Sequence, residues 1–151
     1  MTTQADRQQW MGALAKADPE TLQALFKDIT PQPSWEQLRA PEPGLVMVRG
    51  RSGGVGNPFN LGEMTVTRSA VRLDSGETGV SYVAGRDKVH AETAAVLDAM
   101  LQTSEWHETV KASVIDPLQS AQAGDRDQRL RQRAATRVDF FTMTRTREDK
   151  A

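Results

Sequence analysis

The segment GRDKVHAE, residues 85–92, brings several chemically capable side chains to one point of the chain. It places five of them directly after a glycine turn and at the start of a helical pattern: Arg86, Asp87, Lys88, His90 and Glu92. Free amide groups and the dipole at a helix N-terminus attract anions, and two cations nearby would add to that attraction. The segment therefore predicts a site for an anion or for a partner's carboxylate. The alternative is an ordinary helix start, capped by Asp87, in which His90 and Glu92 bond to neighbouring groups.

The three letters HAE, which contain His90 and Glu92, also match part of the zinc-water motif of nucleobase deaminases, in which the histidine binds zinc and the glutamate carries protons. That motif needs two cysteine ligands as well, but the chain has no cysteine and only one other histidine, His107. We therefore expect no metal site. Positions 90 and 92 of a helix lie about 200° apart, so the two side chains should face different surroundings. We expect His90 at an interface, or supporting a neighbouring group.

A second segment, GRSGGVGNPFNLGE at residues 50–63, is rich in glycine. Backbone amides in such a loop are able to cradle a phosphate. The segment is neither a P-loop nor a dinucleotide fingerprint, because no Gly-Lys-Ser/Thr and no helix follow it. We therefore favour the wide turn of a β-hairpin, with anion binding as the alternative. The candidate binding residues here are Arg51, Gly53, Gly54 and Gly56, together with Arg68 in the strand that follows.

A third segment, residues 125–147, contains seven arginines and three aspartates. A local excess of positive charge is typical of contacts with nucleic acid or polyphosphate. Aromatic residues for base stacking are limited to the adjacent Phe140 and Phe141, which would point to opposite faces of a strand. With a pI near 6.1 for the whole chain, we do not expect nucleic-acid binding. We expect a helix that faces solvent or another subunit.

The composition describes one folded domain, residues 1–151, with a thin core. Leucine, isoleucine, valine and phenylalanine number 29 of 151 residues, but the net charge is only −1, so charge repulsion does not oppose folding. A folded chain with so few core residues is expected to share apolar surface with a partner subunit. No apolar run approaches the 18 residues of a membrane span. We expect a cytoplasmic protein without membrane contacts.

Hydrophobic periodicity and turn residues predict the elements that must position these segments. Residues 1–30 should form a pair of helices, with Trp10, Leu14 and Ala17 on one face and Asp18-Pro19 starting the second helix. Antiparallel strands should follow at residues 35–39, 45–51, 63–73 and 79–84, the first two joined by the turn APEPG. An alanine-rich helix is predicted at 88–102, a helix at 104–114 that ends near Pro117, an arginine-rich helix at 125–136, and a final strand at 137–144.

The predicted fold class is therefore α+β, with a four- or five-stranded antiparallel sheet and helices packed on one of its faces. Residues 34–102 would hold the sheet and the alanine-rich helix, and residues 104–144 the remaining helices and the last strand.

Several blocks of the sequence closely resemble the PhnG family, the small subunit of the bacterial carbon–phosphorus lyase core complex. The blocks are GNPFNLGEMTVTRSAVRL, GVSYVAGRDKVHAE and TRVDFFTMTR, with RQQWMGALAKA near the N-terminus. They occur in the family's order and span nearly the whole chain. The sequence diverges mainly at residues 18–40 and 119–132.

The resemblance implies a role in phosphonate breakdown. With PhnH-, PhnI- and PhnL-like partners, members of the family take part in displacing adenine from ATP by methylphosphonate, which gives ribose 1-methylphosphonate 5-triphosphate. The core complex also holds a PhnJ-like subunit, and the nucleosidase chemistry is attributed to the PhnI-like partner, the closest partner expected here. The chain would then be an accessory subunit with no cofactor and no activity alone, and its catalytic residues stay unknown.

Two other functions are compatible with the residues themselves. One is a stand-alone enzyme acting on a phosphate ester or nucleotide through the GRDKVHAE segment, and the other is a nucleic-acid-binding module built on the arginine-rich segment. Turnover or salt-dependent nucleic-acid binding by the purified chain would distinguish them from the accessory subunit.

Overall fold

Two helices open the part of the chain that the structure describes, residues 3–136 of a computed structural model. Helix α1 (Gln4–Ala15) buries Trp10 and Leu14, as the apolar stripe predicts, and α2 (Pro19–Lys27) buries its apolar face as well. The N-terminal helical pair is therefore present with the expected break at Asp18.

The two helices begin at side-chain caps. In α1, Asp6 N–H donates to Thr3 Oγ1 at 3.2 Å, and Thr3 N–H donates back to Asp6 Oδ2 at 3.0 Å. In α2, Thr21 N–H donates to Asp18 Oδ2 at 2.9 Å. Hydrogen bonds from the Thr3 side chain and from the Thr21 backbone hold the pKa of Asp6 and of Asp18, respectively, below the ordinary value of 3.8. The charged form of each cap is thus the one that the folded chain favours.

Three antiparallel strands form the sheet within residues 3–136, in the order β1-β2-β3. They are β1 (Trp35–Arg51), β2 (Pro58–Leu73) and β3 (Thr78–Ala84). The predicted number of four or five strands is not confirmed, because two predicted strands belong to β1 and the predicted strand at residues 137–144 lies outside the described residues. The α+β class and the antiparallel pairing are confirmed.

The predicted turn at APEPG is wrong, since β1 runs straight through it. Pro41 and Pro43 are tolerated because β1 is an edge strand, where a missing N–H need not break a ladder of hydrogen bonds. The pairing of β1 with β2 shifts in register on either side of Arg39, close to the two prolines. Proline and glycine that suit a reversal in isolation are here placed in a bulged edge strand.

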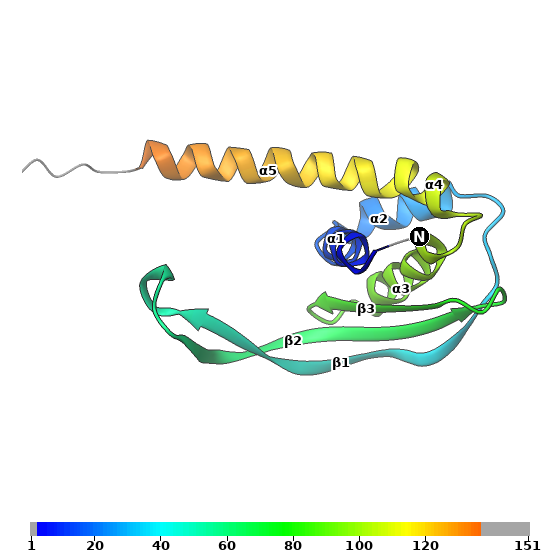
Figure 1. The fold of residues 1–151 in the computed structure, drawn as a ribbon, viewed down its shortest axis with the longest axis horizontal. Coiled ribbons are helices and arrows are strands. Elements are labelled where there is room, and N and C mark those ends of the chain that lie inside the picture. The colour runs from blue at the N-terminus through cyan, green and yellow to red at the C-terminus, as the bar shows by residue number, and fades with distance from the viewer. Residues whose placement is uncertain (1–2, 137–151) are drawn as a thin grey trace, which may run out of the picture.

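Helix α3 (Lys88–Gln102) has the bounds that the sequence predicts and lies at the centre of the core. Its buried residues include Ala91, Ala94, Ala95, Leu97, Ala99 and Leu101. The helix approaches the sheet closely at Gly79 of β3, where a Cβ would collide with the backbone oxygen of Ala95. All the labelled helices lie on one side of the sheet (Figure 1), as predicted.

The chain after α3 departs from the prediction of two separate helices. Helix α4 (His107–Val110) continues through a π-helical segment (Lys111–Ile115) into α5 (Asp116–Ala135). Pro117 was expected to end a helix, but it occupies the first turn of α5, where its missing N–H breaks no bond of that helix. The wider π-helical turn just before it accommodates the change in hydrogen bonding. As a result α5 begins nine residues earlier than the expected start at 125.

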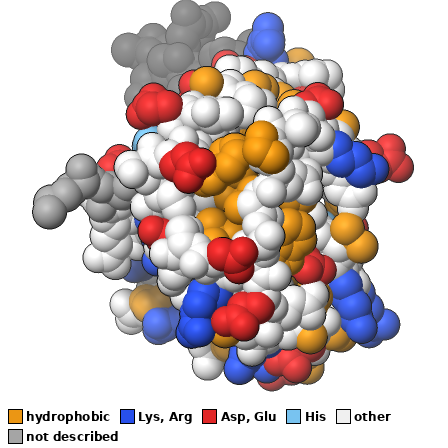
Figure 2. Space-filling view, turned by 90° about the vertical axis from the view of Figure 1, so that its right-hand side faces the viewer, with side chains coloured by type: hydrophobic (Ala, Val, Ile, Leu, Met, Phe, Trp, Pro, Cys, Tyr) orange, Lys and Arg blue, Asp and Glu red, His pale blue; other side chains and the backbone are white. Residues whose placement is uncertain are grey.

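The molecule has two projections on the same side. Figure 1 shows α5 extending past α1 above, and the β1–β2 hairpin extending past β3 below. The opposite end of the described chain has no such projection, and Figure 2 shows charged side chains around a strip of hydrophobic ones there. No helix among residues 3–136 combines the length and apolarity needed to cross a bilayer.

Candidate functional site

The projecting hairpin, residues 44–65, is the most distinctive surface of the described chain, and we call it the arm. It consists of the end of β1, a turn, and the start of β2, beyond the last residue of β3. We call the rest of the sheet, with the helices that cover it, the body. Cross-strand pairs such as Val46–Met64 and Leu45–Thr65 continue the register of the body into the arm. Between the pairs Val48–Gly62 and Arg49–Asn60 the register shifts, which leaves Leu61 as an extra residue on β2.

The tip of the arm explains the glycine-rich segment. Gly53 and Gly54 have φ values of +60° and +81°, which residues with a Cβ rarely adopt. Gly56 N–H donates to the backbone oxygen of Ser52 at 2.9 Å, and a Cβ at Gly56 would crowd that oxygen. Arg51 Nη1 donates to the backbone oxygen of Gly56 at 3.2 Å. These four predicted binding residues therefore build a tight turn, in agreement with the hairpin interpretation.

Exposed apolar side chains concentrate on the arm. Six of the ten exposed large hydrophobic residues described lie there: Leu45, Met47, Val55, Phe59, Leu61 and Met64. Leu61 is 66% exposed and Val55 is 92% exposed. Several exposed apolar side chains on one projection of a folded chain are typical of a binding surface, and a two-stranded hairpin alone is only marginally stable in water. The arm therefore has the properties of a surface that another protein covers.

Arg68, a further predicted binding residue, lies in the body of β2. Its Nε donates to Glu42 Oε1 at 3.1 Å across the β1–β2 pair, and Arg39 is 3.8 Å from the same carboxylate. Both partners of the Arg68 pair are about half exposed, so the pair adds little stability. Its role in binding stays a prediction.

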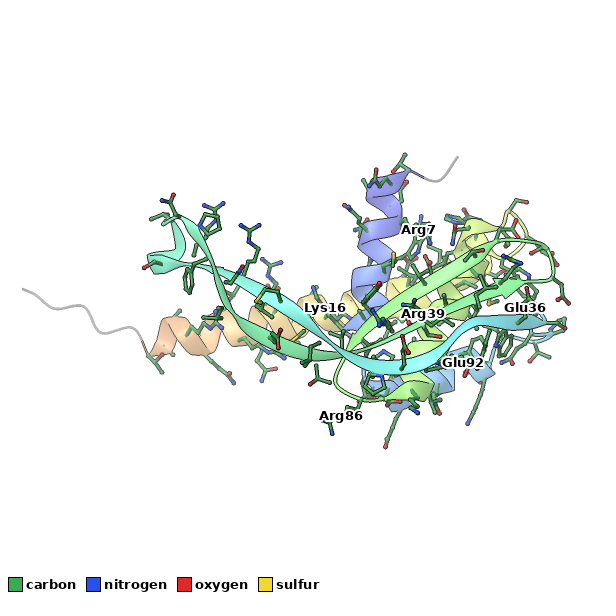
Figure 3. All side chains as sticks on the ribbon, turned by 90° about the horizontal axis from the view of Figure 1, so that it is seen from below. Arg7, Lys16, Glu36, Arg39, Arg86 and Glu92 are labelled. Carbon is green, nitrogen blue, oxygen red and sulfur yellow. The ribbon has the colours of Figure 1, made fainter. Side chains whose placement is uncertain are left out.

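The GRDKVHAE segment lies at the start of α3. Asp87 Oδ1 accepts a hydrogen bond from His90 N–H at 2.9 Å, so Asp87 is the helix cap. Arg86 and Lys88 are exposed, and Figure 3 shows Arg86 near the middle of the molecule, away from the tip of the arm. The two cations are therefore available to an anion or a partner, while Asp87 is engaged within the chain.

His90 and Glu92 point to different surroundings. His90 is buried, and its Nε2 lies 2.9 Å from the backbone oxygen of Leu14 near the end of α1. Glu92 Oε1 accepts from Trp35 Nε1 at 3.1 Å and from Gln37 Nε2 at 2.8 Å, both on β1. His90 thus ties α1 to α3, and Glu92 ties α3 to the sheet. The expected separation of the two side chains is what the structure shows.

The predicted residues do not converge on one reaction centre. Gly85, before α3, donates its N–H to the backbone oxygen of Thr65, and Thr65 lies seven strand residues, about 23 Å, from Pro58 at the base of the turn. The glycine-rich turn and the α3 start are therefore two separate places. No three His, Asp or Glu side chains within residues 3–136 are grouped so that they could hold a metal ion.

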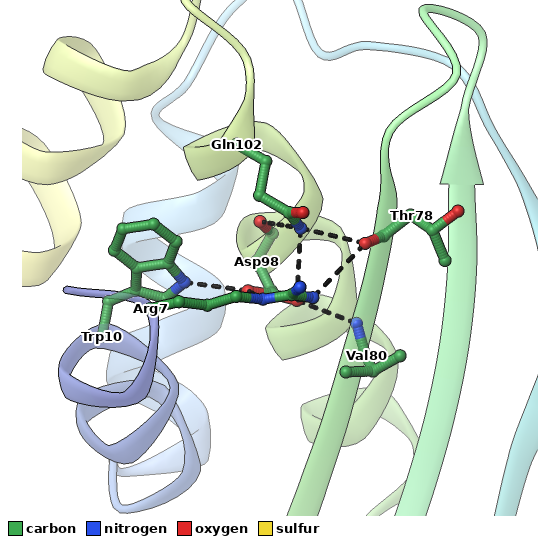
Figure 4. A network of polar contacts seen from close by, with 6 residues as sticks. All are labelled: Arg7, Trp10, Thr78, Val80, Asp98 and Gln102. Atoms are coloured by element: carbon green, nitrogen blue, oxygen red, sulfur yellow. Dashed lines mark hydrogen bonds and ion pairs between the residues drawn. The ribbon is translucent and has the colours of Figure 1, made fainter. Parts of the chain in front are cut away.

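A buried carboxylate that the sequence patterns did not predict, Asp98, lies on the sheet-facing side of α3. Its side chain is fully buried and accepts from Arg7 Nη2 at 2.7 Å, Trp10 Nε1 at 2.8 Å and Val80 N–H at 3.0 Å. Gln102 adds a long contact at 3.5 Å (Figure 4). The network joins α1, α3 and β3, and no buried side-chain polar atom in the described chain lacks a partner. Asp98 is therefore a structural anchor with every oxygen engaged.

One signal for Asp98 was present in the sequence. Asp98 is the only acid between positions 93 and 102, and the alanines and leucines of this helix indicate that the helix is buried throughout. A charged residue at such a position requires a partner. That partner, Arg7, is 91 residues away, so spacing alone does not reveal it.

A groove lies between α1 and α5, next to the end of β3. Its lining includes Gly12 from α1, Lys16 directly after α1, Arg126 and Arg129 from α5, and Ala84 from β3. Gln122 Nε2 donates to the backbone oxygen of Ala13 at 2.9 Å and fixes α5 to α1 at the inner end. Beyond Gln122 every residue of α5 up to Ala135 is exposed.

Comparison with known proteins agrees with the sequence blocks. A family model described as phosphonate metabolism protein PhnG matches residues 5–146. A protein of Rhizobium meliloti (strain 1021), alpha-D-ribose 1-methylphosphonate 5-triphosphate synthase subunit PhnG, is 44% identical over 141 residues. The alignment covers 93% of this chain and 90% of that relative.

Proposed function

The chain belongs to the PhnG family of phosphonate metabolism proteins, and from this premise we propose that it is an accessory subunit of a ribose 1-methylphosphonate 5-triphosphate synthase. In this role it acts with PhnH-, PhnI- and PhnL-like partners in a core complex that also holds a PhnJ-like subunit. The assembly transfers methylphosphonate to the ribose of ATP and releases adenine. The chain contributes structure and contacts to this reaction, and it binds no cofactor of its own.

The exposed apolar side chains of the arm are the main support for this proposal. A monomer that worked alone would leave Phe59, Leu61 and Met64 exposed on a two-stranded projection, at a cost in solubility and with no gain in packing. Burial of such side chains by another subunit supplies the apolar contact that the thin core of the chain lacks. The name of the Rhizobium relative, a synthase subunit, agrees with this role.

The alternative of a stand-alone enzyme has less support from the geometry. Catalysis on a phosphate ester needs a nucleophile or base next to the groups that bind the anion. Arg86 and Lys88 are exposed, but His90 is buried under α1 and Glu92 is bonded to β1. The segment therefore supports contact with an anion or a partner better than it supports a reaction.

The test is reconstitution with the arm altered. Leu61→Asp places a charge on the arm, and Leu38→Asp places the same charge on the body half of β1 at a side chain that is also exposed. Each full-length variant is co-expressed with the other synthase subunits, and co-purification and adenine release from ATP with methylphosphonate are measured. We expect Leu61→Asp to lower both by about tenfold or more, because a carboxylate in an apolar interface is costly.

The control, Leu38→Asp, should keep most of the assembly and the adenine release. If the wild-type chain does not co-purify with the other subunits, or if adenine release is the same without it, the accessory role is wrong. Turnover of ATP by the isolated chain would support the stand-alone enzyme.

A further inference from the structure

Strand β3 pairs with its neighbour β2 along only part of the length of β2. It pairs with residues Val66 to Arg72, and the last bond runs from Gly85 N–H to the backbone oxygen of Thr65 at 2.9 Å. On its other edge β2 pairs with β1 as far as Pro58. Within residues 3–136, the arm half of β2 therefore has a strand on one edge only. An open edge of this kind presents unpaired N–H and C=O groups to which another strand is able to pair.

The period of two along a strand identifies the groups that face this edge. The backbone oxygen of Thr65 points to the β3 side, so the N–H and C=O of Glu63, two residues away, point to the same side. Those of Met64 point instead to Val46 on β1. The extra residue at Leu61 interrupts the regular ladder. The stretch that continues the line of β3 therefore runs over residues 62–65.

The surroundings of this edge define the chemistry of a strand that would bind there. Apolar side chains, Leu61 and Met64, are exposed on the same part of β2. The groove next to Ala84 opens where β3 stops, and its lining holds four cations but only two acids. The cations are Lys16, Arg126, Arg129 and Arg133, and the acids are Asp125 and Asp127.

We propose that residues 62–65 of β2 receive a short extended segment of a partner subunit, which pairs with the backbone and carries both apolar and acidic side chains. This inference rests on the proposed function, since it needs a partner subunit. The segment's backbone bonds to the N–H and C=O of Glu63 and to the N–H of Thr65, its apolar side chains cover Leu61 and Met64, and its acidic side chains meet the cations of the groove.

A second copy of the chain fits this edge less well. Two copies paired edge to edge would bring two basic grooves toward each other, and like charges in one interface oppose binding. An acidic segment from a different protein complements the groove. The charge pattern therefore favours a different subunit over self-association.

Removal of one backbone donor tests the pairing. Glu63→Pro deletes the N–H that faces the open edge and leaves the β1 ladder intact, whereas Glu63→Ala removes only the side chain. Both full-length variants and the wild type are co-expressed with the other synthase subunits. We expect Glu63→Pro to weaken assembly by about tenfold or more and Glu63→Ala by no more than about twofold.

Amide hydrogen exchange of the wild type gives a second measurement that does not depend on a variant's folding. The amides of Glu63 and Thr65 should exchange at least about tenfold more slowly in the assembly than in the isolated chain. Equal exchange rates, or normal assembly of Glu63→Pro while the wild type co-purifies, would overturn strand addition and leave the accessory role in place. Failure of the wild type to co-purify overturns both proposals.

Amide exchange also distinguishes two other possible occupants of the edge, the chain's own last residues and a second copy of the chain. If the isolated chain already protects these amides and a chain ending at Thr136 does not, the chain's own last residues occupy the edge. If protection rises with the concentration of the isolated chain and a dimer forms, a second copy occupies it. Either result would contradict a partner's strand.

Discussion

The same two strands, β1 and β2, build two unlike halves of one sheet. In the body, α3 covers the sheet, and side chains such as Val71 and Leu73 of β2 are buried. In the arm, the next residues of the same strands leave Leu45 and Leu61 more than half exposed. Figure 3 shows side chains of the arm projecting from its ribbon.

The difference places the buried core of the chain in the body and the surface proposed for assembly in the arm. The body has its helices, its core and a satisfied buried carboxylate, so it accounts for the stability of the monomer. The arm adds little burial to the monomer, and its apolar surface is available for association. Variants in the body should therefore change the stability of the monomer, and variants in the arm should change its assembly with other subunits.

The largest effect is expected from a charge in the centre of the body. Leu97 on α3 is fully buried, and Leu97→Asp loses its apolar burial and adds an unpaired carboxylate, a cost of several kcal/mol against a total stability of about 5–15 kcal/mol. We expect loss of soluble expression. Leu61→Asp on the arm should express and melt like the wild type in a thermal unfolding experiment. Normal melting of Leu97→Asp would show that α3 is not the centre of the core.

The buried ion pair is expected to give the next largest effect. Asp98→Ala leaves Arg7 and the N–H groups of Trp10 and Val80 without their acceptor, which should lower the free energy of unfolding by about 3 kcal/mol. The matched control is Glu36→Ala, which breaks an exposed pair with Arg72 and should cost under about 1 kcal/mol. Urea unfolding measures both. Equal costs would show that the Asp98 network does not join the elements of the body.

Two glycines of the sheet give a direct contrast between the halves. Gly79→Ala would push a methyl group into the backbone of α3 at Ala95, and such overpacking costs about 1–3 kcal/mol. Gly62→Ala on the arm meets no atom within 4 Å and should change the unfolding midpoint very little. If both variants melt alike, the close contact of β3 with α3 is not a feature of the fold.

The smallest expected effect is on how the stability of the chain falls at low pH. The pKa of Asp18 is lowered by the Thr21 N–H bond, so its stabilising effect is complete well above pH 3.8 and is lost as the pH falls through the lowered value. Asp18→Asn keeps a capping side chain but does not titrate. Its unfolding midpoint should therefore fall less than that of the wild type between about pH 5 and pH 2.5. Parallel curves for the two proteins would rule out this role for the Asp18 charge.

Local signals predicted much of the body. The bounds of α3 follow from its apolar pattern and from Asp87 as a cap, and the start of α2 follows from Asp18-Pro19. The glycine-rich turn was also predicted, because its conformation is set by neighbouring residues. Each of these features depends on contacts a few residues apart, which spacing and residue type encode.

The features that were missed depend on the rest of the fold. Whether Pro41 and Pro43 interrupt a strand depends on its position at the sheet edge, which the residues around them do not specify. Asp98 is acceptable in the core only because Arg7 reaches it from α1. The separation of the glycine-rich turn from the start of α3 is likewise set by the length of β2, so proximity of these two predicted sites could not be judged from the sequence.

The π-helical segment Lys111–Ile115 has a consequence for the helical phase of everything after it. A turn of π-helix holds about one residue more than a turn of α-helix, so removing one residue there would restore an ordinary helix and leave the later positions facing nearly as before. If the segment became α-helical with no residue removed, the later positions would instead rotate by about one residue's step of 100° around the axis. The side of α5 that carries Arg126 and Leu130 would then turn away from α1, while the helical content of the chain stayed almost constant. The extra residue of the π-helical turn thus sets which face of α5 lines the groove.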